Sequence, residues 1–391
     1  MKKTIIKFTS VIFFPIVYFI LFLKKVFNIR FGLLDLSRIG HATSFAMNYL
    51  IEKKTEDSTH IDILFCSRDV SNNFIKKKLT KKIFFIDFFF VYKIISYFYK
   101  YILKKDFDDI KFNINSLSQN YITDKLINFN KEEQNLVKNE LSKLNINHQD
   151  KWICVHNRDD SYLKETYPKE DWSYHNYRNF PINDLSKVCK KMIENGYTVI
   201  RVGNIVKEPI DFKHSKLIDY HLLKNKSELL ECYFLTNAHL YFGSDSGIFN
   251  LAMVNKIPFC FINFPSITNM VKYYNWNPIP FIFKLRKNKE NEIISLSEVF
   301  ENRLDNVFRL EEFKRKGIQL VDNTPDDISD LFSEIKQNSK PEEGPSQSRE
   351  DNYLEKKFWE IFESCSQVDD IPKIKPKIGR KFLKNHSYIL Q

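Results

Sequence analysis

Short apolar runs that alternate with helical patterns constrain the fold of this chain most strongly. The run from Trp152 to Val155 is β-branched and aromatic, which is typical of a buried strand. Similar runs recur at 198–202, 217–220, 240–243 and 258–262, with helical patterns between them. Because parallel strands are joined by crossover helices, this alternation predicts an α/β fold with a parallel sheet.

The alternation begins earlier in the chain. Runs at 31–36, 61–66 and 82–86 predict strands, with helices over 42–53 and 70–79 between them. A polar passage over 106–150, which holds a predicted helix at 131–144, separates this part from the next. We therefore predict four parts: a hydrophobic and basic segment over 1–28, an N-terminal Rossmann-like domain over 29–148, a C-terminal Rossmann-like domain over 149–337, and a low-complexity linker with a helical tail over 338–391, whose basic end we expect to be loosely ordered.

Ionisable residues follow the strand at 152–155 directly, in the order His156, Asn157, Arg158, Asp159 and Asp160. Ligands of open parallel sheets bind at the carboxyl ends of the strands. The planar guanidinium of Arg158 suits a phosphate, and we expect His156 to donate to the same oxygens. The alternative is a strand that ends in a solvated turn.

A second loop of this kind follows the strand at 240–243. It reads Ser244, Asp245, Ser246, Gly247 and leads into a helical pattern over 248–255. A small, hydroxyl-rich turn before a helix predicts an anion site at the helix N-terminus, although Asp245 can also serve only as a helix cap. Two such loops in one domain indicate a ligand that contains phosphate. No G-x-G-x-x-G follows a strand, so a dinucleotide cofactor is not indicated.

The composition excludes several classes of protein. A hydrophobic content of 43% and an aromatic content of 15% exclude a largely disordered chain. The net charge is +11, but the 60 basic and 49 acidic residues are spread along the chain without a nucleic-acid-binding motif, so we predict no nucleic-acid partner. The six cysteines form no C-x-x-C pair, which favours the reducing cytoplasm over a disulfide or zinc scaffold.

Two apolar stretches point to a membrane. The first, 11–23, contains Pro15, lies between groups of lysines and is too short to span a bilayer comfortably. We predict that residues 1–28 associate with the inner face of the cell membrane, the alternative being an ordinary buried helix. The second stretch, 84–105, mixes aromatic residues with lysines. It is either a buried strand and helix or a surface that lies against a membrane or a lipid-linked substrate.

Five motifs occur in a fixed order between residues 38 and 264. They are R-I-G-H ending at His41, H-x-R at 156–158, Y-R-N-x-x-I at 177–182, G-Y-x-V-I-R-x-G at 196–203 and G-S-D-S-G at 243–247. This set resembles a family of bacterial glycosyltransferases encoded with surface-polysaccharide genes. The resemblance implies a GT-B fold, in which two Rossmann-type domains with parallel sheets face a cleft that holds the sugar nucleotide.

More distant similarity implies individual roles. In fucosyltransferases an H-x-R holds the donor phosphates, which corresponds to His156 and Arg158. In heptosyltransferases a turn like that of Ser244, Asp245, Ser246 and Gly247 binds donor phosphate, and an I-G-D turn places a catalytic carboxylate. Here the third residue of that turn is His41, which can act as a general base near neutral pH. Asp159 or Asp160 is the second choice for the base.

The expected reaction is transfer of a sugar from a nucleotide-sugar donor to a surface glycan or a lipid-linked acceptor, without a metal ion or a cofactor. Arg158, His156 and the amides of Ser246 and Gly247 would stabilise the charge of the leaving diphosphate. We expect Arg201 and Gly203 to contact the base or phosphate, and Tyr177, Arg178 and Asn179 to close over the donor. The alternatives are a sugar-nucleotide epimerase and a non-catalytic membrane-associated carbohydrate-assembly protein.

Overall fold

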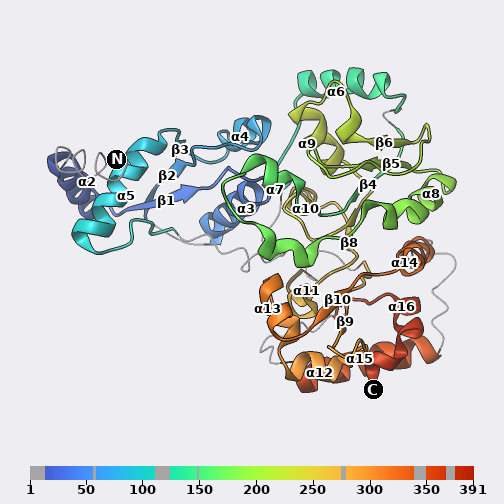
Figure 1. The fold of residues 1–391 in the computed structure, drawn as a ribbon. Coiled ribbons are helices and arrows are strands. Elements are labelled where there is room, and N and C mark those ends of the chain that lie inside the picture. The colour runs from blue at the N-terminus through green and yellow to red at the C-terminus, as the bar shows by residue number, and fades with distance from the viewer. Residues whose placement is uncertain are drawn as a thin grey trace. The chain divides into compact units, whose positions relative to one another are not determined.

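Contacts within the chain divide this computed structural model into two units, Met1–Asn130 and Lys131–Gln391 (Figure 1). The structure describes residues 14–55, 59–110, 124–147, 149–273, 279–338, 349–366 and 375–391. The first thirteen residues of the predicted membrane segment, and most of the predicted low-complexity linker, lie outside this part. Each unit is described separately below.

The N-terminal unit contains a three-stranded parallel sheet in the order β1-β2-β3. Along the chain its elements are α2 (Phe14–Val26), β1 (Ile29–Leu34), α3 (Ile39–Thr55), β2 (Ile61–Cys66), α4 (Asn73–Leu79), β3 (Phe85–Ile86), α5 (Phe89–Phe98) and a π-helical turn (Tyr99–Leu103). The predicted strands and the predicted α/β alternation are therefore confirmed. An aromatic cluster that includes Phe31, Phe65 and Phe98 forms much of its core.

The aromatic stretch 84–105 has a buried side and an exposed side. Tyr92, Ile95 and Phe98 of α5 are buried in the aromatic cluster. Phe90 of the same helix is 58% exposed, so the interpretation as a buried helix holds for one side only, and contact of the other side with a membrane stays a prediction. Within the described ranges, no helix combines the length and the hydropathy needed to cross a membrane.

The C-terminal unit contains a five-stranded parallel sheet in the order β6-β5-β4-β7-β8. Its elements up to residue 273 are α6 (Lys131–Lys143), β4 (Trp152–His156), α7 (Ser161–Thr166), 3₁₀ turns at Ser173–Arg178 and Ile182–Leu185, α8 (Ser186–Glu194), β5 (Thr198–Arg201), β6 (Leu217–Asp219), α9 (Glu228–Thr236), β7 (Leu240–Gly243), α10 (Phe249–Met253), β8 (Phe259–Phe261) and α11 (Ile267–Tyr273). Counted along this unit, the order is 3-2-1-4-5, which is the order of the first five strands of the Rossmann sheet. Each strand lies within a residue or two of its predicted range.

The order of the strands reverses between β4 and β7, and ligands of doubly wound sheets bind outside the carboxyl ends of such a pair. In the register of the two strands His156 is opposite Gly243. A Cβ atom on Gly243 would lie 2.0 Å from the carbonyl oxygen of His156, so only glycine allows this close approach. The loops after β4 and β7 therefore start side by side.

The boundary between the units differs from the predicted one at 148/149. Helix α6 lies against α9, and it buries Val137 and Leu141. The hydroxyl of Ser227, which caps α9, donates to Glu140 at 2.9 Å. These contacts attach residues 131–143 to the C-terminal unit, whereas a polar, amphipathic pattern in the sequence does not say which domain a helix covers.

The remainder of the C-terminal unit packs more tightly than predicted. Its elements are β9 (Leu285–Lys287), α12 (Leu296–Glu301), α13 (Leu310–Arg315), β10 (Gln319–Val321), which pairs antiparallel with β9, α14 (Pro325–Asn338), α15 (Arg349–Cys365) and α16 (Arg380–Asn385). Phe382 and Leu390 are buried, and Glu334 of α14 accepts from the amides of Arg380 and Lys381, both at 2.8 Å. The expectation of a loosely ordered basic end was therefore wrong for 375–391, because apolar side chains between the lysines enter the core.

Candidate functional site

Arg158 is a buried cation at the carboxyl end of β4. The residue is only 6% exposed. One guanidinium nitrogen, Nη1, donates to the carbonyl of His175 at 3.2 Å and to the side-chain oxygen of Asn179. The other, Nη2, is buried and has no hydrogen-bond partner among the described residues. Burial lowers the pKa of Arg158 to about 10, and the nearby charge of Arg178 acts in the same direction.

Arg178 joins this site from the 3₁₀ turn at Ser173–Arg178. Its Nη1 donates to the backbone carbonyl of Asp245 at 3.2 Å, which connects it to the loop after β7. Its Nε and the hydroxyl of Ser244 are both buried without a partner in the described part of the chain. Buried polar groups are rarely left unbonded, so these atoms mark a place for a ligand or for water.

The carboxyl group of Asp245 lies within the field of three cations. Burial raises its pKa, while the charges of Arg178, Arg158 and Lys284 act to lower it. The charge of this carboxylate is therefore offset by the surrounding cations, and the backbone carbonyl of Asp245 is the group that bonds to Arg178. A capping role alone does not fit, because α10 begins only at Phe249 and its N-cap, Ile248, has no side-chain bond.

Lys284 completes the cluster, although no motif in the sequence indicated it. It is 3% exposed, and its Nζ contacts Asp322 at 2.6 Å and the carbonyl of Asn179 at 2.7 Å. Burial lowers its pKa, against the opposing effect of Asp322. The available signal was a lysine inside the apolar run 281–285, because a charge in such a run requires a specific partner.

The balance of charge in this cluster favours an anionic ligand. Arg158, Arg178 and Lys284 supply three positive charges, against the carboxylates of Asp245 and the partly exposed Asp322. Two guanidinium nitrogens and one hydroxyl remain available as donors. Guanidinium groups bind phosphate oxygens through paired, charge-assisted hydrogen bonds. We name Arg158, Arg178, Ser244, Asp245 and Lys284 the cation cluster.

His156 does not have the proton that the expected hydrogen bond to a phosphate would need. Its Nδ1 lies 3.0 Å from the carbonyl oxygen of Val202, which can only accept, so Nδ1 carries the proton. Burial lowers the pKa of His156 to about 4, and the imidazole is therefore neutral at pH 7. Its Nε2 then has no proton to give to a phosphate. The expected donation from His156 is contradicted, because the tautomer is set by a carbonyl that the sequence motif does not contain.

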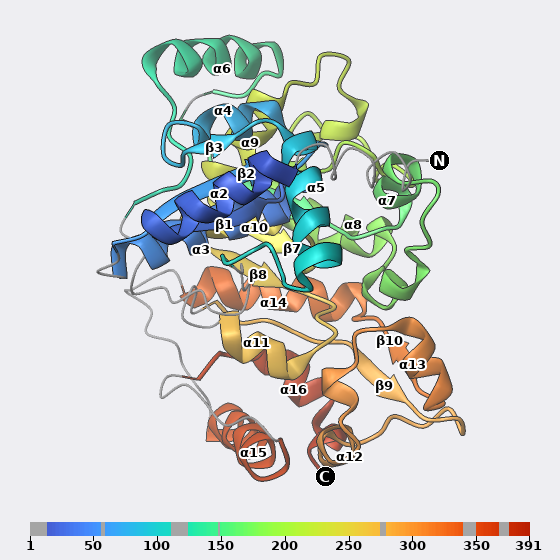
Figure 2. The same cartoon turned by 90° about the vertical axis from the view of Figure 1, so that its left-hand side faces the viewer.

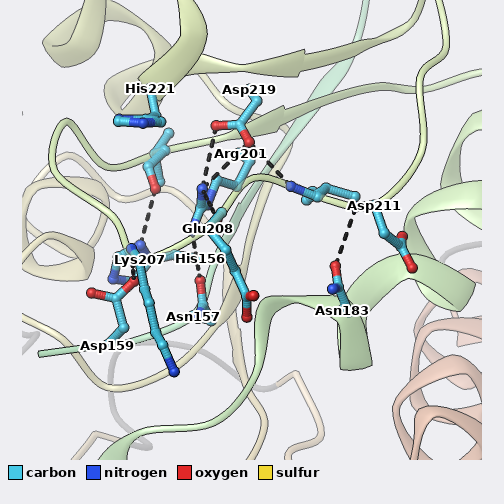
Figure 3. A network of polar contacts seen from close by, with 12 residues as sticks. His156, Asn157, Asp159, Asn183, Arg201, Lys207, Glu208, Asp211, Asp219 and His221 are labelled. Carbon is cyan, nitrogen blue, oxygen red and sulfur yellow. Dashed lines mark hydrogen bonds and ion pairs between the residues drawn. The ribbon is translucent and has the colours of Figure 1, made fainter. Parts of the chain in front are cut away.

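Arg201 lies in the core beneath the loops (Figure 3). It is 0% exposed, and its guanidinium donates to Asp219 at 3.3 Å and to the side-chain oxygen of Asn157 at 3.2 Å. Asn157 in turn donates to the carbonyl of Phe180 at 3.0 Å. Arg201 thus joins the carboxyl ends of three strands. Gly203 follows with a φ of +126°, which makes it a turn residue.

Asp159 and Asp160 are poorly placed to act as bases. The carboxylate of Asp159 accepts from the amide of Ser161 with one oxygen and from the amide of Lys207 with the other, each at 2.9 Å. Asp160 pairs with Lys164 at 2.6 Å, and this hydrogen bond lowers its pKa. Both carboxylates therefore serve the local structure of the loop.

The turn at 244–247 does not form a helix-terminus site. Helix α10 has only five residues, and the amide of Ser246 donates to the carbonyl of Ser244 at 3.0 Å. That amide is therefore not available to a leaving group in this conformation, and Gly247 lies exposed at the tip of the turn. Side-chain cations, not helix amides, dominate the electrostatics here.

His41 lies in the N-terminal unit, on the first turn of α3. Its Nδ1 is 2.7 Å from a carboxylate oxygen of Asp35 and 3.3 Å from Arg38. The shorter contact needs a proton on Nδ1, because a carboxylate only accepts, and Nε2 is then left as a proton acceptor. Burial acts to raise the pKa of Asp35, but hydrogen bonds from His41 and Ser37 lower it overall. The result is an oriented Asp–His pair, suited to general base catalysis.

Within the ranges that the structure describes, no group of three or more His, Cys, Asp and Glu side chains is placed to hold a metal ion. The absence of a metal from the reaction stays a prediction.

No protein family and no curated protein matches the chain. Among solved structures, ADP-heptose lipopolysaccharide heptosyltransferase II of E. coli is similar over 66% of this chain and 90% of its own length, at 11% identity and a TM-score of 0.37. A family 9 glycosyl transferase of Veillonella parvula is similar over 61% of this chain and 81% of its own, at 11% identity and a TM-score of 0.32. The iron-containing dodecameric glycosyltransferase TibC of enterotoxigenic E. coli covers 60% of this chain and 57% of its own, at 14% identity and a TM-score of 0.30. Likeness at this level supports no conclusion about activity.

Proposed function

We propose that this chain is a glycosyltransferase that moves a sugar from a nucleotide-sugar donor to a surface glycan or a lipid-linked acceptor. The observation that supports this most is the cation cluster, which lies at the switch point between β4 and β7 and has unbonded donors on Arg158 and Arg178. A diphosphate linked to a nucleoside fits such a site, because it brings the negative charge and the oxygens that these groups lack. The ordered motifs between 38 and 264 give independent support.

In this proposal the two units are the two domains of a GT-B enzyme. The C-terminal unit binds the donor, with its diphosphate on Arg158, Arg178 and Lys284. The N-terminal unit receives the acceptor beside the Asp35–His41 pair. The similarity of His156 and Arg158 to the H-x-R of fucosyltransferases stays a prediction. In this proposal the neutral imidazole of His156 does not bind phosphate and instead holds the loop after β5 through its bond to Val202.

The proposed chemistry assigns a step to each group. The acceptor hydroxyl attacks the anomeric carbon while Nε2 of His41 takes its proton. The bond between that carbon and the diphosphate oxygen breaks, and the electron pair leaves with the nucleoside diphosphate. The growing charge on the leaving group is stabilised by the guanidinium groups of Arg158 and Arg178 and by the ammonium of Lys284. These three cations supply the charge for which other transferases use a divalent metal ion.

Thermal unfolding of the full chain with GDP, UDP, ADP and CMP tests the donor site. A ligand at about 100 times its dissociation constant stabilises the folded state by roughly 2.7 kcal/mol. We expect one nucleoside diphosphate to raise the Tm, and Arg158→Met and Arg178→Gln to abolish the shift. The matched control is Arg315→Gln, because the Arg315 side chain is 79% exposed on α13. If none of the nucleotides changes the Tm, the cation cluster is not a donor site.

The same protein separates the competing activities. Incubated with the matching nucleotide sugar alone, a glycosyltransferase releases nucleoside diphosphate slowly, with water as the acceptor. A sugar-nucleotide epimerase instead converts the donor into an isomer that keeps its diphosphate bond. A non-catalytic carbohydrate-assembly protein does neither.

A further inference from the structure

Helix α2 of the N-terminal unit is apolar on two opposite sides. Ile20 and Leu21 pack against the aromatic cluster around Phe31 and Phe98. Tyr18, Phe19, Phe22 and Val26, which share one side of the helix because they are spaced three and four residues apart, are 65%, 59%, 60% and 56% exposed. A helix on the surface of a protein in water normally turns a polar side outward. This helix exposes aromatic rings instead.

Helix α5 repeats the arrangement next to it. Its inner side, with Tyr92 and Ile95, belongs to the same aromatic cluster as Ile20 and Leu21 of α2. Its outer side carries Phe90, 58% exposed, and Lys93. The following π-helical turn adds Tyr101, 55% exposed, whose ring lies 4.3 Å from that of Tyr97. Both views show α2 and α5 side by side, and Figure 2 faces them directly. We call the exposed side chains of α2, α5 and Tyr101 the aromatic face.

The charge of the aromatic face is mainly positive. Residues 14–28 and 88–105 contain the lysines 24, 25, 93, 100, 104 and 105 and no Asp or Glu. Lys24 is bonded to Asp109 at 2.7 Å, which neutralises part of its charge. Lys93 and Lys100 are exposed, and each lies over a ring of its own segment, Phe89 at 5.2 Å and Tyr101 at 5.8 Å. Lysine stems of this kind lie along apolar surface while their ammonium groups reach toward negative charge.

We propose that the aromatic face binds the surface of a lipid bilayer that contains anionic headgroups. Aromatic rings insert at the boundary between headgroups and acyl chains, and lysines at their edge pair with anionic lipid. A second copy of the chain would bring the lysines 25, 93, 100, 104 and 105 of one face against the same lysines of the other, and this repulsion opposes self-association through the same face. An anionic bilayer supplies both the apolar depth and the opposite charge. The surface joins part of the 1–28 segment to the outer side of the 84–105 stretch, the two stretches for which the sequence suggested membrane contact.

Co-flotation of the full-length protein with vesicles tests this proposal. We expect binding to vesicles of phosphatidylcholine mixed with phosphatidylglycerol, weaker binding to phosphatidylcholine alone, and a decrease as salt screens the lysines. The aromatic variant F19S/F22S/F90S should lower the partition coefficient by roughly tenfold or more. The charge variant K25Q/K93Q/K100Q should lower it on the anionic vesicles by about fivefold per lysine.

The matched control removes exposed apolar side chains from the other unit. Leu222, Tyr353 and Phe308 are 62%, 59% and 41% exposed, and L222S/F308S/Y353S should bind vesicles as the natural chain does. All variants change side chains that are already exposed, so their Tm and their nucleotide response should be preserved, which separates this test from that of the donor site. Three results would overturn the proposal: no binding to either vesicle, unchanged binding by the aromatic variant, or a dimer in light scattering that the aromatic variant dissociates.

Discussion

At the scale of single residues, Lys284 is a buried cation that the proposed donor site would use. Its ammonium has two bonds in the protein, to Asp322 and to the carbonyl of Asn179, and it lies in the field of Asp245. A charge-assisted hydrogen bond contributes about 1.5–3 kcal/mol. We therefore predict that Lys284→Met weakens nucleoside diphosphate binding by roughly 10- to 100-fold, measured by isothermal titration calorimetry.

The control for this substitution is Lys314→Met on the exposed side of α13. Asp322 keeps about a third of its side chain in water, so the loss of its partner should cost little folding stability. Equal affinity of Lys284→Met and the natural chain would show that Lys284 only holds Asn179 and Asp322 in place.

A second prediction at this scale concerns the Asp35–His41 pair. Asparagine at position 35 keeps the shape of the side chain but loses the charge that orients Nδ1 and stabilises the imidazolium. We expect Asp35→Asn to lower kcat of the proposed transfer by about 10²- to 10⁴-fold with little change in the KM for the donor. Asp124→Asn, at a side chain that is 76% exposed, is the control. An unchanged kcat would assign the base to another residue.

The sequence motifs identified the site residues that follow strands, and also Arg178 in the loop after β4, but they did not identify Lys284. Arg158, Ser244 and Asp245 could be predicted, because each lies just after a strand end. Lys284 could not, because it reaches the cluster from a segment forty residues further along the chain from Ser244. The tautomer of His156 and the burial of Arg201 depend on Val202 and Asp219, which no short motif includes.

At the scale of elements, helix α9 contains a buried carboxyl group, that of Glu231. Glu231 is 8% exposed, and burial raises its pKa from 4.5 to about 7, with Glu228 adding to the shift. The folded state therefore holds a proton that the unfolded state releases between these pH values, so the free energy of unfolding falls as the pH rises from about 4.5 to 7. Glu231→Gln should remove this dependence and stabilise the fold by on the order of 3 kcal/mol at pH 8.

Urea denaturation at about pH 4.5 and pH 8 measures this effect. The two proteins should have nearly equal stability at the lower pH. Glu194→Gln, at the exposed end of α8, should follow the natural chain at both values. A gain of equal size at both values would mean that the glutamine improves packing and that the charge of Glu231 is not the cause.

Elements whose pattern is self-contained were predicted well. Strands β2 and β7 have the ranges expected from their apolar runs, since each is bounded by polar residues on both sides. Helix α10 is shorter than predicted. The chain turns at residues 254–256, whose amides bond to carbonyls of the preceding turn, and Lys256 has a φ of 63°. The assignment of α6 to a unit depends on packing against α9, which periodicity alone does not contain.

At the scale of the whole molecule, the contact between α6 and α9 leads us to predict which C-terminal fragment folds on its own. Residues 131–391 form a unit with their own cores and sheets. We expect a fragment that starts at Lys131 to fold and to keep the nucleotide-dependent rise in Tm. A fragment that starts at Gln149 would lose Val137 and Leu141, which are 0% and 1% exposed, and should lose several kcal/mol of stability.

Circular dichroism and thermal unfolding of both fragments distinguish the two boundaries. If the shorter fragment is as stable as the longer one, α6 is an accessory helix and the predicted boundary at 148/149 is the functional one. If neither folds, the C-terminal unit depends on the first 130 residues, and the proposed donor site must be studied in the full chain.

The network of Arg201, Asp219 and Asn157 has a consequence for how such a protein can diversify. It joins the ends of β4, β5 and β6 below the surface, and through Asn157 it holds Phe180 at the end of the loop over 159–180. Because Arg201, Asp219 and Asn157 are buried and bond to one another, substitutions in the loops above them would not remodel the sheet, and in the proposed transferase they would alter the sugar or base that is accepted. If the chain is the proposed transferase, its descendants would exchange one donor for another through a few loop mutations, while Arg201 itself would tolerate almost none.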